Sequence, residues 1–237
     1  MIKAVIFDLD DTIISSNKHI TEGLASVFTK TKKRLGGITL DKFLKANRRA
    51  TDSLLQPKNL TLHQFGFLIW YETFNNLKVE PNPALVFTCY QTLQDYILGH
   101  IELEPGILRV LAFLRKNNYK IAILSNGSFL ERMKKLEKLR LLDKIDLLVS
   151  SDLIGKDKPN PQPFEATLKM LGITHNEAVY VGDSFDEDIL GAKVAGILPI
   201  LYSKGNNKII KNKIPDVTII KRHTDLIRIL NNLRKKK

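Results

Sequence analysis

Short apolar runs alternate with amphipathic stretches along most of the chain. Residues 1–10, and everything after about residue 102, contain brief runs that are almost wholly apolar, each followed by a stretch with helical periodicity. Such runs are typical of strands buried on both faces of a sheet. We expect strands at Ala4–Phe7, Lys120–Leu124, Leu147–Ser150, Val179–Val181, Leu198–Leu201 and Val217–Ile220. We expect helices near residues 105–117, 128–138, 162–171, 186–195 and 223–234. This alternation predicts an α/β fold with a doubly wound, Rossmann-like parallel sheet and right-handed crossovers.

Residues 15–101 have a different texture, with helical periodicity and no convincing strand. Helices are expected near residues 20–35, 40–55, 61–77 and 82–99. The pattern therefore predicts an α/β core made of residues 1–14 and 102–237, with an all-helical domain inserted at residues 15–101. Aromatic residues at helical spacing are typical of a bundle core rather than of a base-stacking platform. We assign that core position to Phe65, Phe67, Trp70, Tyr71 and Phe74.

Composition narrows the class of protein. A chain of 237 residues that is 43% hydrophobic and 26% charged is typical of a globular protein and not of a disordered or fibrous one. No run approaches 18 apolar residues, and the apolar start is too short for a signal peptide, so no membrane segment is expected. Cys89 is the single cysteine. It excludes an internal disulfide, fits a reducing, cytoplasmic setting, and lies in an apolar helical stretch where we expect it to be buried.

The formal net charge of +12 raises the question of a polyanionic partner. The lysines are spread over most of the chain, with modest clusters at 30–34, 204–213 and 234–237, and aromatic residues are not interleaved with them. This distribution is typical of a solvated basic surface. We therefore expect no specific nucleic-acid binding, and the sequence leaves the choice between a monomer and a homodimer open.

Candidate chemistry is concentrated in four segments that follow predicted strands, where open α/β sheets bind their ligands. The first is Asp8-Leu9-Asp10-Asp11-Thr12, directly after Ala4–Phe7. Side chains alternate along an extended chain, so Asp8 and Asp10 are expected on one side, about 7 Å apart before the chain curls. Two like charges at about 4 Å near a protein surface repel by about 4 kcal/mol, which a divalent cation would relieve.

The other three segments come later in the chain. Ser125-Asn126-Gly127 ends a strand before a helix, where hydroxyl and backbone donors can face an anion. Lys156-Asp157-Lys158-Pro159-Asn160-Pro161 has prolines that stiffen a helix entry near two lysines. The segment from Gly182 to Asp188 follows another strand and carries four acids, of which Asp183 lies nearest the strand end and could join Asp8 around a metal. Each segment alone is also compatible with ordinary caps and turns.

Taken in order, the four segments resemble the signature motifs of the haloacid dehalogenase superfamily of phosphohydrolases, over residues 4–196. The resemblance implies that residues 15–101 form a helical cap, and it is nearest to nucleotidases and N-acylneuraminate 9-phosphatase-like members. It implies Asp8 as the nucleophile that forms an aspartyl-phosphate, and Asp10 as the general acid and then the general base.

The same resemblance implies how phosphate and metal would be held. Thr12 would support the first loop, Ser125 and the Asn126 backbone would hold the transferring phosphoryl group, and Lys158, rather than Lys156, would pair with its oxygens. Mg²⁺ would be bound by Asp8, the carbonyl of Asp10 and Asp183, while Asp188 would hold a metal-bound water or orient Lys158. Hard, oxygen-only ligands favour Mg²⁺ over zinc or copper.

The function expected from these motifs is magnesium-dependent hydrolysis of a small phosphate monoester, of the nucleotide or sugar-phosphate type. A phosphosugar mutase would keep Asp10 and is therefore an open alternative. A 2-haloacid dehalogenase is disfavoured because dehalogenases of the superfamily lack an acid at that position, and a silent binding module is disfavoured because every motif position is intact. Candidate selectivity residues in the insert are Lys18, His19, Lys45, Arg48 and Arg49.

Overall fold

The computed structural model describes residues 1–54, 62–205 and 217–235, and the chain divides into two compact units. The core unit comprises Met1–Ser15 and Glu102–Lys237, and the helical unit comprises Ser16–Ile101. Ser15 belongs to the core unit, one residue beyond the boundary expected from the sequence. It pairs with Glu102 in a short antiparallel ladder between β2 (Ile14–Ser15) and β3 (Glu102–Leu103). The chain therefore leaves the core unit at β2 and returns to it at β3, through one strand pair.

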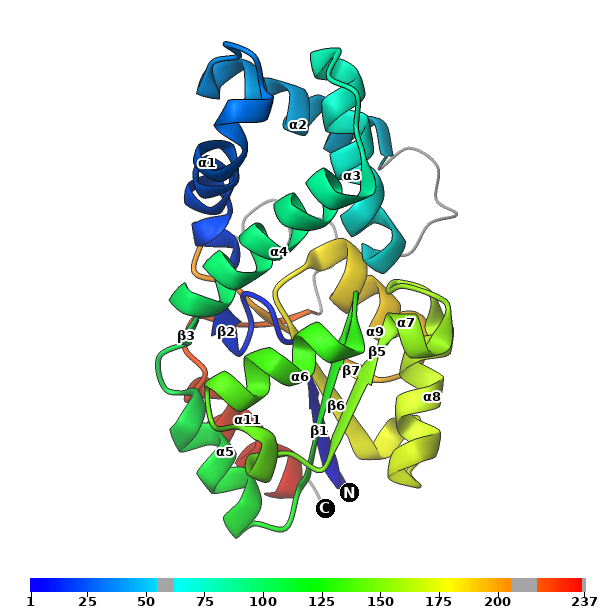
Figure 1. Ribbon diagram of the computed structural model, residues 1–237. Helices are drawn as coiled ribbons and strands as arrows, with labels where there is room; N and C mark the ends of the chain where they lie inside the picture. The colour runs from blue at the N-terminus through cyan, green and yellow to red at the C-terminus, as the bar shows by residue number, and fades with distance from the viewer. Residues whose placement is uncertain (55–61, 206–216, 236–237) are drawn as a thin grey trace. The chain divides into compact units, whose positions relative to one another are not determined.

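The core unit is built on a six-stranded sheet in the order β5-β4-β1-β6-β7-β8, with every pair of neighbours parallel (Figure 1). Its strands are β1 (Ala4–Phe7), β4 (Lys120–Ser125), β5 (Leu147–Ser150), β6 (Ala178–Gly182), β7 (Leu198–Tyr202) and β8 (Thr218–Ile220). The order reverses direction at β1, which lies between β4 and β6. This confirms the doubly wound sheet and places its switch point at the end of β1, beside Asp8.

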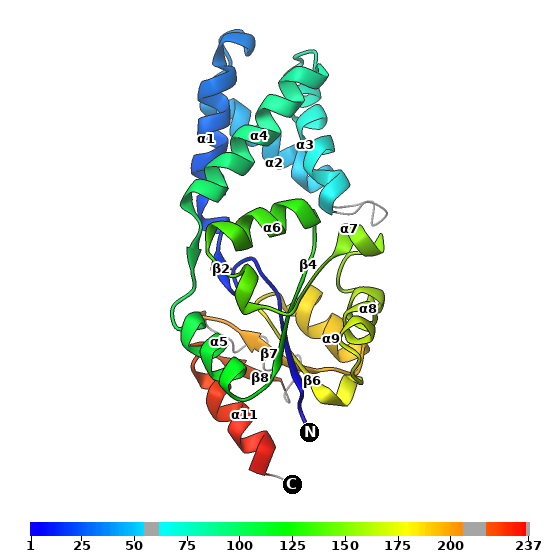
Figure 2. The same cartoon turned by 60° about the horizontal axis from the view of Figure 1, so that its bottom comes forward.

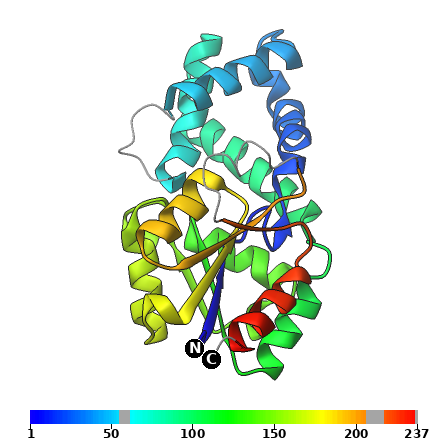
Figure 3. The ribbon, with the colours of Figure 1, turned by 180° about the vertical axis from the view of Figure 1, so that it is seen from behind.

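Helices cover both faces of the sheet (Figure 2). They are α5 (Ile107–Lys116), α6 (Phe129–Lys138), α7 (Ser151–Ile154), α8 (Pro161–Leu171), α9 (Leu190–Val194) and α11 (Asp225–Lys235). Alternate strand residues such as Ile6 and Leu124 pack against Phe164 of α8 and Ala192 of α9 in one buried cluster. Seen from behind, α5 and α11 lie side by side on the other face (Figure 3). Burial of both faces explains why the strands are almost wholly apolar.

The predicted strands are confirmed to within one or two residues at each end. One helix differs: the stretch expected as a single helix at 186–195 is a π-helical turn, Phe185–Ile189, followed by the short α9. The β2–β3 ladder was not predicted, because two residues per strand are too few to produce a recognisable alternation.

The helical unit contains α1 (Ile20–Thr31), α2 (Leu40–Leu54), α3 (Leu62–Leu77) and α4 (Pro83–His100). Its core holds Trp70 and Phe74, with Phe67 and Tyr71 partly buried against it, which confirms the bundle-core prediction for these four residues. Phe65 is half-buried and lies outside this cluster. Cys89 is fully buried there, and burial raises the pKa of its thiol to about 12. Among the described residues, no helix combines the length and apolar character that crossing a bilayer demands. Most of the basic clusters expected at 204–213 and 234–237 lie outside the described residues or at their edge.

Candidate active site

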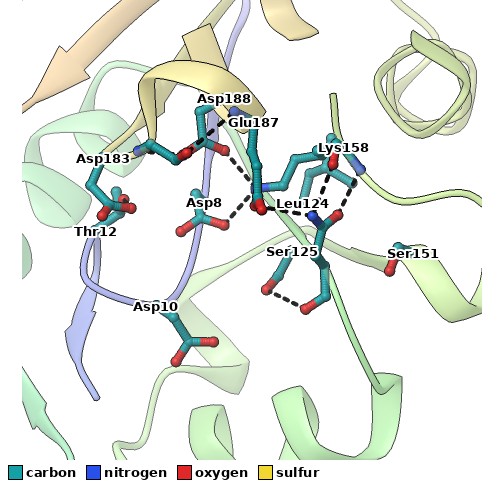
Figure 4. A network of polar contacts seen from close by, with 12 residues as sticks. Asp8, Asp10, Thr12, Leu124, Ser125, Ser151, Lys158, Asp183, Glu187 and Asp188 are labelled. Atoms are coloured by element: carbon teal, nitrogen blue, oxygen red, sulfur yellow. Dashed lines mark hydrogen bonds and ion pairs between the residues drawn. The ribbon is translucent and has the colours of Figure 1, made fainter. Parts of the chain in front are cut away.

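The first segment leaves the sheet through a tight curl. The backbone N–H of Asp8 still donates to the Val181 carbonyl at 2.8 Å, which holds Asp8 at the end of the strand. The Leu9 carbonyl then accepts from both Ile13 and Ile14 at 2.9 and 3.0 Å, and Asp11 takes a positive φ of 57°. The expectation that Asp8 and Asp10 share one side is therefore wrong, because the curl begins before Asp10 and turns its side chain away from Asp8 (Figure 4).

Three carboxylates from two distant segments meet at the carboxyl edge of the sheet. One oxygen from each of Asp8, Asp183 and Asp188 lies within 4.8 Å of the others. Asp188 approaches so closely that a Cβ on Gly182 would lie 2.4 Å from its carboxyl carbon, so glycine is required at that position. The Thr12 hydroxyl donates to Asp183 at 3.2 Å. Thr12 thus holds an acid of the fourth segment, in addition to its place in the first loop.

Lys158 lies between two of these carboxylates. Its Nζ is 2.6 Å from Oδ1 of Asp8 and 2.6 Å from Oδ1 of Asp188, and its side chain is 1% exposed (Figure 4). The Tyr180 hydroxyl accepts a third bond from Nζ at 3.0 Å. Lys156, the competing lysine, is exposed to solvent. The other oxygen of Asp188 accepts from the Ser184 N–H at 3.0 Å, so Asp188 orients Lys158 while remaining in the carboxylate cluster.

The electrostatics of the cluster reflect an excess of negative charge. Burial, reinforced by Asp188, raises the pKa of Asp8 well above its usual range, although Lys158 opposes the shift. Burial and the neighbouring Asp188 also raise the pKa of Asp183 to about 6. For Lys158, burial lowers the pKa, but Asp188 and Asp8 outweigh it, and the ammonium is held charged. One ammonium faces three carboxylates, and a bound divalent cation would neutralise the excess negative charge.

The second segment connects to the third through Asn126. Its Oδ1 accepts from the Lys158 N–H at 2.7 Å, and its Nδ2 donates to the Lys158 carbonyl at 3.2 Å. The same Nδ2 donates to Glu187 at 3.1 Å. The Asn126 side chain is therefore committed to fixing the Lys158 backbone. Its backbone and the Ser125 hydroxyl remain the groups of this segment that could face an anion.

Two cations of α6 were not expected from the sequence. Lys135 Nζ lies 2.5 Å from Oδ1 of Asp10, and Arg132 Nε lies 3.4 Å from Oδ2. Arg132 also donates from Nε to the Ser125 hydroxyl at 3.0 Å and from Nη2 to the Asn126 carbonyl at 2.5 Å. The signal that could have found them is their three-residue spacing, which places two basic side chains on one helix face directly after the second segment.

Two further unexpected residues, Tyr180 and Glu187, contact the same network. Tyr180 stands in the apolar run of β6 and reads as an ordinary strand residue. Glu187 is one of four neighbouring acids, and burial raises its pKa. No spacing in the sequence distinguishes these two residues from the residues around them. Their contacts depend on which strands and turns the fold makes adjacent.

The fold and this site define a Rossmann-like α/β core with an acidic cluster able to bind a cation. The sequence pattern of the haloacid dehalogenase-like hydrolases matches residues 2–196. The chain belongs to this family.

Relatives agree in length as well as in sequence. The phosphoglycolate phosphatase of Aquifex aeolicus is 32% identical over 233 residues, covering 97% of each chain. The glyceraldehyde 3-phosphate phosphatase of Methanopyrus kandleri is 28% identical over 241 residues, covering 99% of this chain and 100% of the relative. The human N-acylneuraminate-9-phosphatase is 25% identical over 211 residues, covering 86% of this chain and 84% of the relative.

Solved structures share the fold. A 2-haloacid dehalogenase from Pseudomonas syringae pv. Tomato DC3000 superposes with a TM-score of 0.76 at 22% identity, covering 98% of this chain and 100% of the other. At that identity the likeness concerns the fold alone.

Proposed function

We propose that this protein is a magnesium-dependent phosphatase that hydrolyses small phosphate monoesters through an aspartyl-phosphate at Asp8. The observation that carries the proposal is the position of Lys158, with its ammonium 2.6 Å from both Asp8 and Asp188 inside a cluster of three carboxylates. Phosphoryl transfer depends mainly on charge placed in advance around the reacting group. A buried ammonium beside a clustered carboxylate nucleophile supplies that arrangement.

The donor atoms of the cluster fit Mg²⁺, which prefers oxygen ligands. Asp8, Asp183 and the Asp10 carbonyl would hold the ion, with Asp188 beside them. The bound ion would screen the phosphate charge and so allow an anionic nucleophile to approach it. The raised pKa values of Asp8 and Asp183 support this assignment, because both groups carry unbalanced charge within a buried cluster.

In the first half of the reaction, an Asp8 carboxylate oxygen forms a bond to phosphorus while the bond from phosphorus to the ester oxygen breaks. Asp10 gives its proton to the departing alkoxide, which leaves as an alcohol. In the second half, Asp10 takes a proton from water, whose oxygen attacks the phosphorus of the aspartyl-phosphate, releasing inorganic phosphate and restoring Asp8. Asp10 thereby ends each cycle protonated again.

The remaining residues bind and orient. Lys158 would pair with the phosphoryl oxygens, and the Ser125 hydroxyl and Asn126 backbone would donate to them. Thr12, through its bond to Asp183, keeps the first loop and the fourth segment in register. Arg132 fixes the Ser125–Asn126 loop from α6.

The relatives support a small phosphorylated metabolite as substrate, because their names specify phosphoglycolate, glyceraldehyde 3-phosphate and an N-acylneuraminate 9-phosphate as what they act on. The helical unit, residues 16–101, would act as a cap that selects the leaving group. Of the candidate selectivity residues, Lys18, Arg48 and Arg49 are exposed, whereas Lys45 pairs with Asp41 at 2.9 Å. We further propose a cytoplasmic setting and a monomer or homodimer.

A panel of phosphate esters tests the proposal. Phosphoglycolate, triose phosphates, sugar phosphates, nucleoside monophosphates and p-nitrophenyl phosphate are assayed for phosphate release with Mg²⁺ and with EDTA. We expect Mg²⁺-dependent release from at least one small ester. Isomerised sugar phosphate without release would instead identify a mutase, halide release from 2-haloacids would identify a dehalogenase, and no turnover of any compound would refute an enzymatic role.

A further inference from the structure

Tyr180 is a buried polar residue at the centre of the sheet. It lies on β6 opposite Ile6 of β1 and Pro199 of β7, and it is fully buried. Its hydroxyl approaches three groups: Lys158 Nζ at 3.0 Å, Asp188 Oδ1 at 2.9 Å and the Leu124 carbonyl at 3.3 Å. An unpaired hydroxyl would be unfavourable in this apolar strand, so the side chain depends on this network.

The Lys158 ammonium uses all of its donors in the same network. It has three N–H groups, and three acceptors surround it: Asp8 and Asp188 at 2.6 Å each, and the Tyr180 hydroxyl at 3.0 Å. A lysine ammonium is otherwise a freely rotating point charge on a flexible stem. Here three fixed acceptors remove that freedom, and the bonds from Asn126 fix the backbone of the same residue.

The three acceptors differ in what happens to them during the proposed reaction. Asp8 would become an acyl phosphate and give up its carboxylate charge, whereas Asp188 and Tyr180 keep their chemistry. A third carboxylate in place of the hydroxyl would add negative charge where a phosphate must enter. A phenylalanine would leave one buried N–H without an acceptor. A neutral hydroxyl satisfies the ammonium without either penalty.

We propose that Tyr180 is a positioning residue for phosphoryl transfer, which together with Asp188 holds the Lys158 ammonium in place while Asp8 exchanges its partner. The inference rests on the proposed function, because it assigns Tyr180 to the step in which Asp8 attacks phosphorus. Tyr180 acts through Lys158 and does not itself touch the substrate.

The test compares Tyr180→Phe with Tyr202→Phe. Tyr202 is a matched control, since it is also a buried tyrosine of the same sheet and donates its hydroxyl proton to Glu104 at 2.8 Å, and Glu104 is not one of the three clustered carboxylates. With p-nitrophenyl phosphate, Tyr180→Phe is expected to lower kcat about tenfold, the effect of losing one hydrogen bond to a charged group, while KM and Mg²⁺ activation change by less than about twofold. Tyr202→Phe should lose thermal stability with kcat within about twofold of the wild type.

A second readout is independent of turnover. In ¹H–¹⁵N spectra of lysine ammonium groups, Lys158 should give a slowly exchanging signal, assigned by its absence in Lys158→Met. That signal should vanish or broaden in Tyr180→Phe and persist in Tyr202→Phe. If Tyr180→Phe fails to fold, site-specific Tyr180→3-fluorotyrosine keeps the ring and hydroxyl but makes the oxygen a weaker acceptor and the O–H a stronger donor, and a smaller drop in kcat is then expected.

Either an unchanged kcat or an unchanged Lys158 signal in a folded Tyr180 variant overturns the inference. If the wild type is active, this result leaves the proposed function standing. An inactive wild type across the whole ester panel overturns the proposed function, and the positioning role of Tyr180 falls with it.

Discussion

Lys158 Nζ lies 2.6 Å from Oδ1 of Asp8, although 150 positions separate the two residues in the chain. The pair joins the end of the central strand β1 to the loop before α8. Asp188, in the turn after β6, binds the same ammonium. Breaking a buried pair by removing one partner leaves an uncompensated charge, so each member depends on the others.

Asp8→Asn should abolish turnover. The amide keeps the shape of the side chain but is not a nucleophile, so a loss of at least about a thousandfold in kcat is expected. Beryllium fluoride should form a stable complex with the wild type and Mg²⁺ but not with the variant, as followed by protection from thermal unfolding. Asp143→Asn, a change to an exposed acid that pairs with Lys144 and is not part of the cluster, is the control. Mg²⁺-dependent phosphatase activity that survives in Asp8→Asn would refute the assignment.

Asp10→Asn should discriminate between leaving groups. A positioned general acid contributes about 10²–10⁴-fold where the departing alkoxide needs a proton. Hydrolysis of alkyl phosphates should therefore fall by roughly that factor, whereas formation of the aspartyl-phosphate from p-nitrophenyl phosphate should fall much less. The measurement is a rapid-quench comparison of the two substrate types. Equal losses for both would argue that Asp10 has a structural role, held by Lys135 and Arg132.

Removal of metal should inactivate the enzyme and destabilise the folded protein. Mg²⁺ that binds the folded state alone at about 100 times its Kd would add about 2.7 kcal/mol to the free energy of unfolding. Asp183→Asn should weaken Mg²⁺ binding at least about tenfold by deleting one carboxylate ligand, as measured by titration calorimetry. Asp186→Asn, which alters an exposed acid of the same segment, should leave the affinity nearly unchanged. Comparable affinities in the wild type and Asp183→Asn would exclude Asp183 as a ligand.

His223 should make stability depend on pH. Burial lowers its pKa from 6.5 to about 4, opposed by Glu104, and its ring stacks on Tyr202 at 4.0 Å. Between pH 4 and 6.5 the unfolded chain binds a proton that the folded chain does not, so stability rises with pH across this window and is lost on acidification. The contribution is on the order of 3 kcal/mol.

Urea unfolding of wild type and His223→Phe between pH 4 and 8 checks this. Phenylalanine preserves the stacking and cannot take up a proton, so the variant should show a shallower dependence between pH 4 and 6.5. His175→Phe, at an exposed histidine, should keep the wild-type slope. If stability depended on pH equally in His223→Phe and the wild type, another group would be responsible for the loss of stability at low pH.

Much of the fold followed from the sequence. Buried parallel strands are almost wholly apolar, so short runs such as Ala4–Phe7 identify them without knowledge of their neighbours. Because these strands are parallel, their carboxyl ends meet at one edge, which is why acids as distant as Asp8 and Asp183 could be expected together. The spacing of Lys158 to Pro159 likewise singled out one of two lysines, through the resemblance to a known family.

Tertiary structure alone decided the direction of side chains beyond the strand ends. Strand alternation predicted that the side chains of Asp10 and Asp8 would lie on the same side of the chain. The hydrogen bonds of Ile13 and Ile14 to the Leu9 carbonyl curl the chain before Asp10 is reached. Asp10 therefore meets Lys135 instead. The contacts of the Tyr180 hydroxyl could not be predicted from the sequence either. Periodicity predicts whether a position is buried, but not that the fold places Lys158, more than twenty residues away, against it.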